Sequence, residues 1–166
     1  MDELVLSGDS SVPDPNGNSD IANKRYVDEM NRAIWLRAER PKFGTGGSWD
    51  RVNFGSSQVQ GNIPKDSSSR FTIPSDGVYV YHAMTEDHDN CGDDDDVELR
   101  IRRERSGSTA TLAKQNSRPG GSGTVEIPIN VHYVGYTTAG TKVWLEAREE
   151  CGHVNSPAFM VYRLGS

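Results

Sequence analysis

Apolar and polar residues alternate along most of the chain after Pro41, and this period of two is the feature that most limits the fold. In residues 97–105 and 124–134, aliphatic side chains occupy every second position between charged or polar ones. Such alternation is typical of a β-strand with one face in a core and the other in water. Clusters of Gly, Pro, Ser and Asp separate the strand-like segments, as turns require.

This pattern predicts eight strands, at residues 51–54, 71–73, 77–84, 97–105, 110–115, 124–134, 141–148 and 158–164. Short antiparallel strands in this number favour a sandwich or a jelly roll. A chain of 166 residues can bury a substantial core, and 17 Gly with 8 Pro suit a fold rich in turns. We therefore expect an all-β antiparallel jelly-roll sandwich, preceded by an extended leader and one α-helix.

The residues before Pro41 follow a different pattern. Residues 1–19 are polar and include a Pro-Asp-Pro-Asn-Gly turn. A helix is predicted to start after Ser19 or Asp20, because either residue can cap it. It is predicted to end near Glu39, since the residue before a proline is biased away from helical geometry.

One narrow apolar stripe, formed by Val27, Met30 and Ile34, runs along the predicted helix. A stripe this narrow suits a coiled-coil seam or an anchor on another protein. Packing of the helix against its own barrel is the alternative. The predicted division is an anchoring leader and helix at 1–40 and a head domain at 41–166.

Two of the predicted strands, 77–84 and 158–164, are apolar on both faces. Only one face of each can meet the opposite sheet of a sandwich. The second face needs another cover, and a further copy of the chain is an economical one. The residues concerned are expected in the core or at a subunit interface: Val78, Tyr79, Val80, Tyr81, Phe159, Met160, Val161 and Tyr162.

The segments RFTIPSDGVYVYHA and TKVWLEAREE…NSPAFMVYRL resemble strands of the jelly-roll domain shared by complement component 1q and tumour necrosis factor. The resemblance implies that the two doubly apolar strands are neighbours in the inner sheet, around a threefold axis. A homotrimer is the expected assembly. Met160 departs from the family pattern, which usually has a small residue at that position of the last strand.

The segments LVLSGD at 4–9 and DIANKRYVDEM at 20–30 resemble the leader of tailed-phage fibre and appendage proteins. Together the two resemblances imply a bacteriophage virion protein: a homotrimeric short fibre that displays its head for host attachment. Its partners would be other phage proteins of the tail, baseplate or capsid, and a glycan or protein of the host surface. The alternative is a capsid decoration or head-fibre protein that ornaments or stabilises the shell.

Net charge and hydropathy argue against several classes of protein. The net charge of −6 argues against a nucleic-acid partner, and no run of about 18 apolar residues is present to span a membrane. The acidic start MDELVLSGD lacks the features of a secretory signal. We therefore expect synthesis in the host cytoplasm and a final location on the virion surface. This weighs against a third candidate, a secreted ligand-binding jelly roll.

The chain has two cysteines, Cys91 and Cys151, and both fall in predicted loops. If strands 77–84 and 158–164 are antiparallel neighbours, these loops share one end of the barrel. A disulfide is favoured, and free thiols are an alternative. Zinc held by His88, Cys91, Cys151 and His153 is the third, although neither half has a CxxC spacing.

An acidic run near the same end, formed by Asp93, Asp94, Asp95 and Asp96, supplies oxygen ligands suited to calcium. A solvated loop is the favoured interpretation, because no EF-hand spacing is present. We expect that the protein requires no cofactor, although calcium or zinc could bind at these positions.

No catalytic constellation is recognisable in the sequence. His82 lies within an apolar strand and is expected to be packed and hydrogen-bonded. His132 lies on a polar face without a nearby nucleophile. No GxSxG segment occurs at a strand-to-helix turn. The protein is therefore not expected to be an enzyme.

Overall fold

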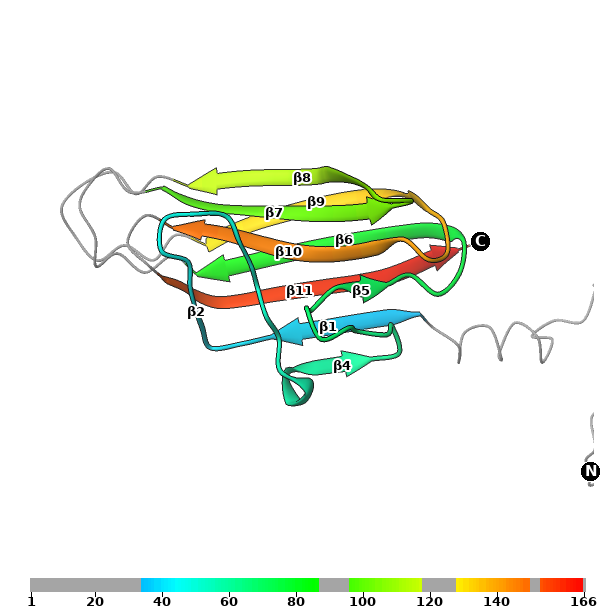
Figure 1. Cartoon of the computed structure of the whole chain (residues 1–166), viewed down its shortest axis with the longest axis horizontal. Coiled ribbons are helices and arrows are strands. Elements are labelled where there is room, and N and C mark those ends of the chain that lie inside the picture. The colour runs from blue at the N-terminus through cyan, green and yellow to red at the C-terminus, as the bar shows by residue number, and fades with distance from the viewer. Residues whose placement is uncertain (1–33, 87–95, 118–127, 150–152, 166) are drawn as a thin grey trace, which may run out of the picture. The chain divides into compact units, whose positions relative to one another are not determined.

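The computed structural model describes residues 34–86, 96–117, 128–149 and 153–165, which form two facing antiparallel sheets (Figure 1). One sheet has six strands in the order β4-β1-β11-β6-β9, with β2 also paired to β11. The other has five strands in the order β3-β10-β7-β8, with β5 paired to β10. The predicted all-β jelly-roll sandwich is confirmed.

The strands of the six-stranded sheet are β1 (Trp35–Glu39), β2 (Lys42–Gly44), β4 (Val59–Gly61), β6 (Gly77–Glu86), β9 (Pro128–Thr137) and β11 (His153–Gly165). Those of the five-stranded sheet are β3 (Asp50–Arg51), β5 (Phe71–Thr72), β7 (Val97–Arg105), β8 (Ser108–Ser117) and β10 (Lys142–Glu149). A 3-10 turn, η1 (Ser56–Gln58), precedes β4. No helix within the described ranges is long and apolar enough to cross a membrane.

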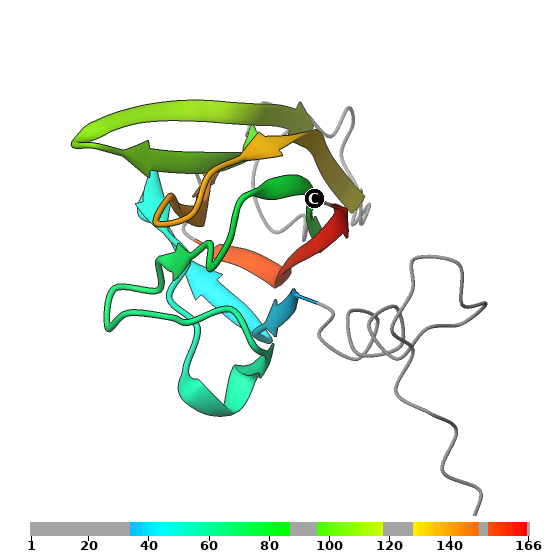
Figure 2. The same ribbon diagram turned by 90° about the vertical axis from the view of Figure 1, so that its right-hand side faces the viewer.

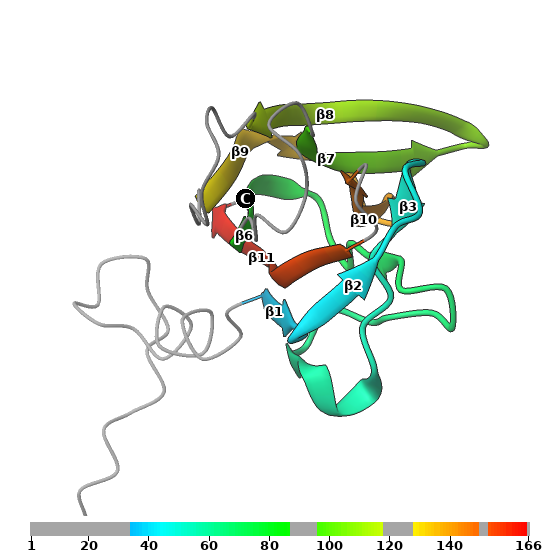
Figure 3. The same cartoon turned by 90° about the vertical axis from the view of Figure 1, so that its left-hand side faces the viewer.

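The core lies between the two sheets, as the end-on view shows, with β7 and β8 above and β11 and β1 below (Figure 2). The rings of Phe71 on one sheet and Phe159 on the other lie 5.9 Å apart between centroids, and both are fully buried. From the opposite end, β2 is seen to lead into β3, which belongs to the other sheet (Figure 3). The chain therefore changes sheet at this corner.

Tyr81 makes a polar contact within this core. Its hydroxyl donates to Oγ1 of Thr137 at 2.7 Å, and its ring lies 5.9 Å from that of Tyr133. Burial raises the pKa of the Tyr81 hydroxyl well above its ordinary value. The side chain therefore stays neutral and hydrogen-bonded inside the sandwich.

The predicted end of the N-terminal helix is wrong. Residues 35–39 form β1, in which Leu36 and Ala38 point into the core and their neighbours point outward. Ile34, assigned above to the helical stripe, packs against the core, and its carbonyl accepts a hydrogen bond from the Arg163 amide at 2.9 Å. Pairing with β11 outweighs the local helix preference of the Arg and Glu residues.

The domain boundary at Pro41 moves with this correction, because the barrel already includes Ile34 and β1. The rest of the predicted leader and helix, with Val27 and Met30, lies outside the described residues. So do residues 124–127 of one predicted strand, of which β9 forms the remainder and extends to Thr137. Strands β2 and β4 were not predicted.

We predict that Phe159→Ala lowers the free energy of unfolding by about 3–5 kcal/mol, because it opens a cavity where the two sheets meet. The measurement is chemical denaturation followed by circular dichroism. Gln60→Ala, at an exposed position of β4, is the control and should change stability by less than about 0.5 kcal/mol. Equal effects of the two variants would contradict this account of the core.

Candidate self-association face

Strands β6 and β11 are hydrogen-bonded neighbours, as the family resemblance implied. Tyr79, Tyr81, Phe159 and Val161 point into the core, and all are fully buried. The alternate residues point the other way, away from the opposite sheet. We call this side of the six-stranded sheet the open face; its members on β6 and β11 include Val78, Val80, His82, Met84, Met160 and Tyr162.

Exposed apolar side chains gather on the six-stranded sheet. The large hydrophobic residues that remain exposed in the described part of the chain are Trp35 at 41%, Val134 at 57%, Tyr136 at 59%, Tyr162 at 44% and Leu164 at 60%. All five belong to β1, β9 or β11, and none belongs to the five-stranded sheet. Single exposed apolar residues are ordinary, but a group on one surface marks a contact site.

The strand register places three of these side chains in one row, together with Val80, which is 9% exposed. Trp35 is opposite Tyr162, Tyr162 is opposite Val80, and Val80 is opposite Val134. The row therefore crosses β1, β11, β6 and β9 without interruption. Val78 and Tyr136 face each other on its flank, near Leu164 at the end of β11. This is a continuous aromatic and aliphatic strip.

The next row across the same strands is more polar. It contains Arg37, Met160, His82 and His132, in register from β1 to β9. The two imidazole rings are stacked, with centroids 4.2 Å apart and planes inclined by 14°. Nε2 of His82 lies 3.3 Å from Oδ1 of Asn130. The prediction that His82 is packed and hydrogen-bonded agrees with this placement.

Charge is sparse in these rows. Arg37 is ion-paired with Glu39 at 2.7 Å, and Glu39 lies in the third row with Ala158, Met84 and Asn130. Both partners are about half exposed, so the pair contributes little to stability. Its effect on the open face is to leave these rows without net charge when the histidines are neutral.

The outer side of the five-stranded sheet has the opposite character. Arg100 pairs with Glu146 at 2.6 Å, and Arg148 pairs with Glu98 at 3.0 Å. The guanidinium of Arg100 also lies 4.0 Å from the centre of the Trp49 ring. These ion pairs and cation–π contacts give this sheet a polar surface on which Arg100 and Arg148 have partners within the chain.

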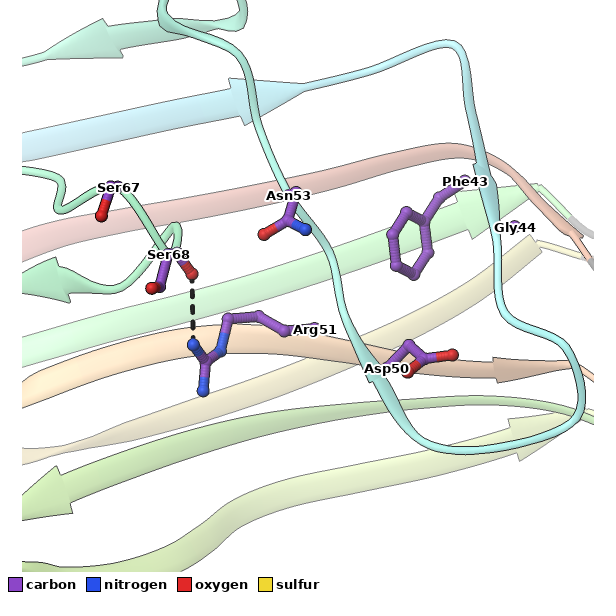
Figure 4. Close-up of a pocket in the computed structure, with 7 residues that line it drawn as sticks. All are labelled: Phe43, Gly44, Asp50, Arg51, Asn53, Ser67 and Ser68. Atoms are coloured by element: carbon purple, nitrogen blue, oxygen red, sulfur yellow. Dashed lines mark hydrogen bonds between the residues drawn. The ribbon is translucent and has the colours of Figure 1, made fainter.

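A polar hollow of about 540 Å³ lies at the corner where β2 leads to β3 (Figure 4). Arg51 donates to the Ser68 carbonyl at 3.3 Å, and its guanidinium lies 4.9 Å from the centre of the Trp144 ring. The lining residues are Phe43, Gly44, Asp50, Arg51, Asn53, Ser67 and Ser68. The hollow offers hydrogen-bonding groups but contains no histidine or cysteine.

The candidate disulfide and metal ligands fall mainly outside the described residues: His88, Cys91, Cys151 and Asp93–Asp95. Asp96 is described and half-buried, and the backbone of His153 begins β11. Within the described ranges, no group of three or more His, Cys, Asp or Glu side chains could hold a metal ion. Asn155 of β11 pairs with Glu86 of β6, so the strand ends that flank the two cysteine-bearing segments lie side by side.

Comparison with known proteins identifies the fold. The chain is similar to the structure of Eiger TNF from S. frugiperda, with a TM-score of 0.53 and 11% identity over 81% of this chain and 94% of that one. It is also similar to murine APRIL, with a TM-score of 0.62 and 13% identity over 80% of this chain and 99% of that one. No family model and no curated protein matches the sequence. The barrel thus has a jelly-roll fold like that of these two proteins.

We predict that Cys91 and Cys151 form a disulfide in protein purified without reductant, because the segments that carry them adjoin neighbouring ends of β6 and β11. Mass spectrometry of the alkylated chain before and after reduction measures this, with Cys151→Ser as the control. Alkylation of both thiols without reduction would contradict the prediction. If zinc was then released by denaturation, the alternative ligand set would be supported.

Proposed function

We propose that this chain is a structural protein of a bacteriophage virion, a homotrimeric short fibre or appendage whose jelly-roll head is displayed for attachment to the host surface. The observation that carries the proposal is the open face, where the exposed large hydrophobic side chains of the described residues gather on one sheet. The leader resemblance at LVLSGD and ANKRYVDE supports the virion role. On this proposal the protein is made in the host cytoplasm, requires no cofactor and is not an enzyme.

Further copies of the same chain are the cover that the open face fits best. Its central strip is aromatic and aliphatic, the kind of surface that is enriched in the cores of subunit interfaces. Arg37 and Glu39 neutralise each other, so identical faces can approach without net repulsion. The threefold arrangement implied by the family resemblance sets the expected number of copies at three.

The division between anchor and display follows from the two parts of the sequence. The polar leader is proposed to bind other virion proteins of the tail, baseplate or capsid. The barrel is proposed to present its loops to a glycan or protein of the host. The charge-paired surface of the five-stranded sheet suits a side that stays in water.

Capsid decoration is the second candidate function. Only a few residues separate the leader motif, which ends at Met30, from β1, which begins at Trp35. A fibre usually needs a longer shaft to hold its head away from the particle. This short connection favours a head that sits directly on the shell.

We predict that Val80→Asp and Met160→Asp each convert the assembly to monomers, because both residues lie on the open face. An unpaired charge buried at an interface costs several kcal/mol. Light scattering measures the change, with three times the mass of one chain expected for the parent. Ser108→Asp adds the same charge at an exposed position of β8 and should stay trimeric. A parent protein that is monomeric at micromolar concentration would contradict the proposal.

A truncated chain that starts at Ile34 tests the role, because the structure places β1 inside the barrel and a start at Pro41 would remove it. If the protein is an adhesin, the truncated trimers should bind cells of the phage's host and reduce infection by added virions. If it is a decoration protein, they should ignore cells, and the full chain should bind capsids. Val80→Asp is the control that loses multivalent binding. Failure to bind either cells or virions would contradict both roles.

A further inference from the structure

The His82–His132 pair lies where a change of charge would act directly on self-association. The two residues are directly opposite each other on β6 and β9, and their rings are in stacking contact at 4.2 Å. They sit one row from the apolar strip that contains Val80 and Val134. The proposed interface therefore carries two titratable rings beside its most apolar part.

Among the side chains that the structure describes, none around the pair is a carboxylate free to neutralise two imidazolium ions. The charged groups of the described residues that face it from the same sheet are Arg37, in the same row, and Glu39, in the next row, and these are ion-paired with each other. Met160 of β11 lies between Arg37 and His82, and Asn130 of β9 is neutral. A protonated pair would place like charges in contact and add to the positive charge of this row.

The elements behind the pair do not supply a counter-ion either. Strand β8 lies beside β9 and carries one charged residue, Lys114, which is engaged by Glu98 and lies over Trp49. The charged residues of β7 belong to the five-stranded sheet, which faces the other side of the core. Neither strand therefore presents a carboxylate to the stacked rings.

We infer that the stacked His82–His132 pair makes self-association through the open face pH-dependent, holding the subunits together at neutral pH and releasing them as the pH falls. This inference rests on the proposed self-association. Imidazoles exchange their proton between about pH 5 and 8. In a separated subunit, water can solvate the two charges, since His82 is partly exposed and His132 is exposed. In the assembly, the same charges would be enclosed beside apolar side chains, which disfavours the protonated form.

The direction of the pH effect on association follows from proton linkage. A separated subunit binds protons more readily than the assembly, so each proton taken up favours separation. Association is therefore strongest above the imidazole range and weakens as the pH falls through it. A difference of one pKa unit at a single histidine changes an equilibrium about tenfold, so with two histidines in each copy we expect at least about tenfold weaker association at pH 5.5 than at pH 7.5.

Sedimentation equilibrium of the full chain at pH 7.5 and pH 5.5 tests the inference, with circular dichroism at both values to follow the barrel. The variant His82→Gln/His132→Gln keeps polar side chains without the titration, and it should associate equally at both pH values. The matched control replaces the two other histidines of the chain, His88→Gln/His153→Gln, and should keep the parent's pH dependence.

The outcomes separate this inference from the proposed function. Dissociation of the parent at pH 5.5 with an unchanged β spectrum, abolished only in the His82/His132 variant, would support it. A parent that stays equally associated at both pH values would overturn the inference and leave the assembly intact, and so would dissociation only with loss of the β spectrum. If the control variant lost the pH dependence instead, the sensor would lie elsewhere. A parent that is monomeric at both pH values would overturn the proposed self-association itself.

Discussion

Strand β11 has hydrogen-bonded partners on both of its edges, and the six-stranded sheet depends on it. Along one edge it pairs with β6, and along the other it pairs with β2 and then β1. One side of the same strand carries Phe159 and Val161 into the core, where Phe159 meets Phe71 of the opposite sheet. The other side carries Met160 and Tyr162 onto the open face. One strand thus connects the sheet, the core and the proposed interface.

The outer surfaces of the two sheets differ in chemical character. The five-stranded sheet covers its outside with ion pairs and cation–π contacts from within the chain, such as that of Arg100 with Trp49 and Glu146. In the described part of the chain, no such layer lies over the strip of Trp35, Tyr162 and Val134 on the six-stranded sheet. A chain that satisfies one surface internally and leaves the other apolar is asymmetric in the way that a subunit of an assembly is expected to be.

Much of the fold could be predicted from the sequence because one face of most strands meets a core, which imposes a period of two. The neighbouring positions of β6 and β11 were also predictable, but only from the family resemblance. Residues 35–39 were misassigned because Arg37 and Glu39 suit a helix locally, and only pairing with β11 decides the structure. The stack of His82 on His132 depends on cross-strand register, which the sequence of either strand alone does not contain.

The position of β1 between β4 and β11 also has a consequence for biosynthesis. The short β4 follows β1 closely in the chain, but β11 emerges from the ribosome roughly 115 residues later, which takes about 6–23 s at ordinary elongation rates. Until then one edge of β1 has no hydrogen-bonding partner, and Leu36 has no complete core to enter. Unpaired strand edges and exposed apolar residues promote aggregation and are recognised by chaperones. The nascent barrel is therefore expected to need protection during translation, whatever its finished stability.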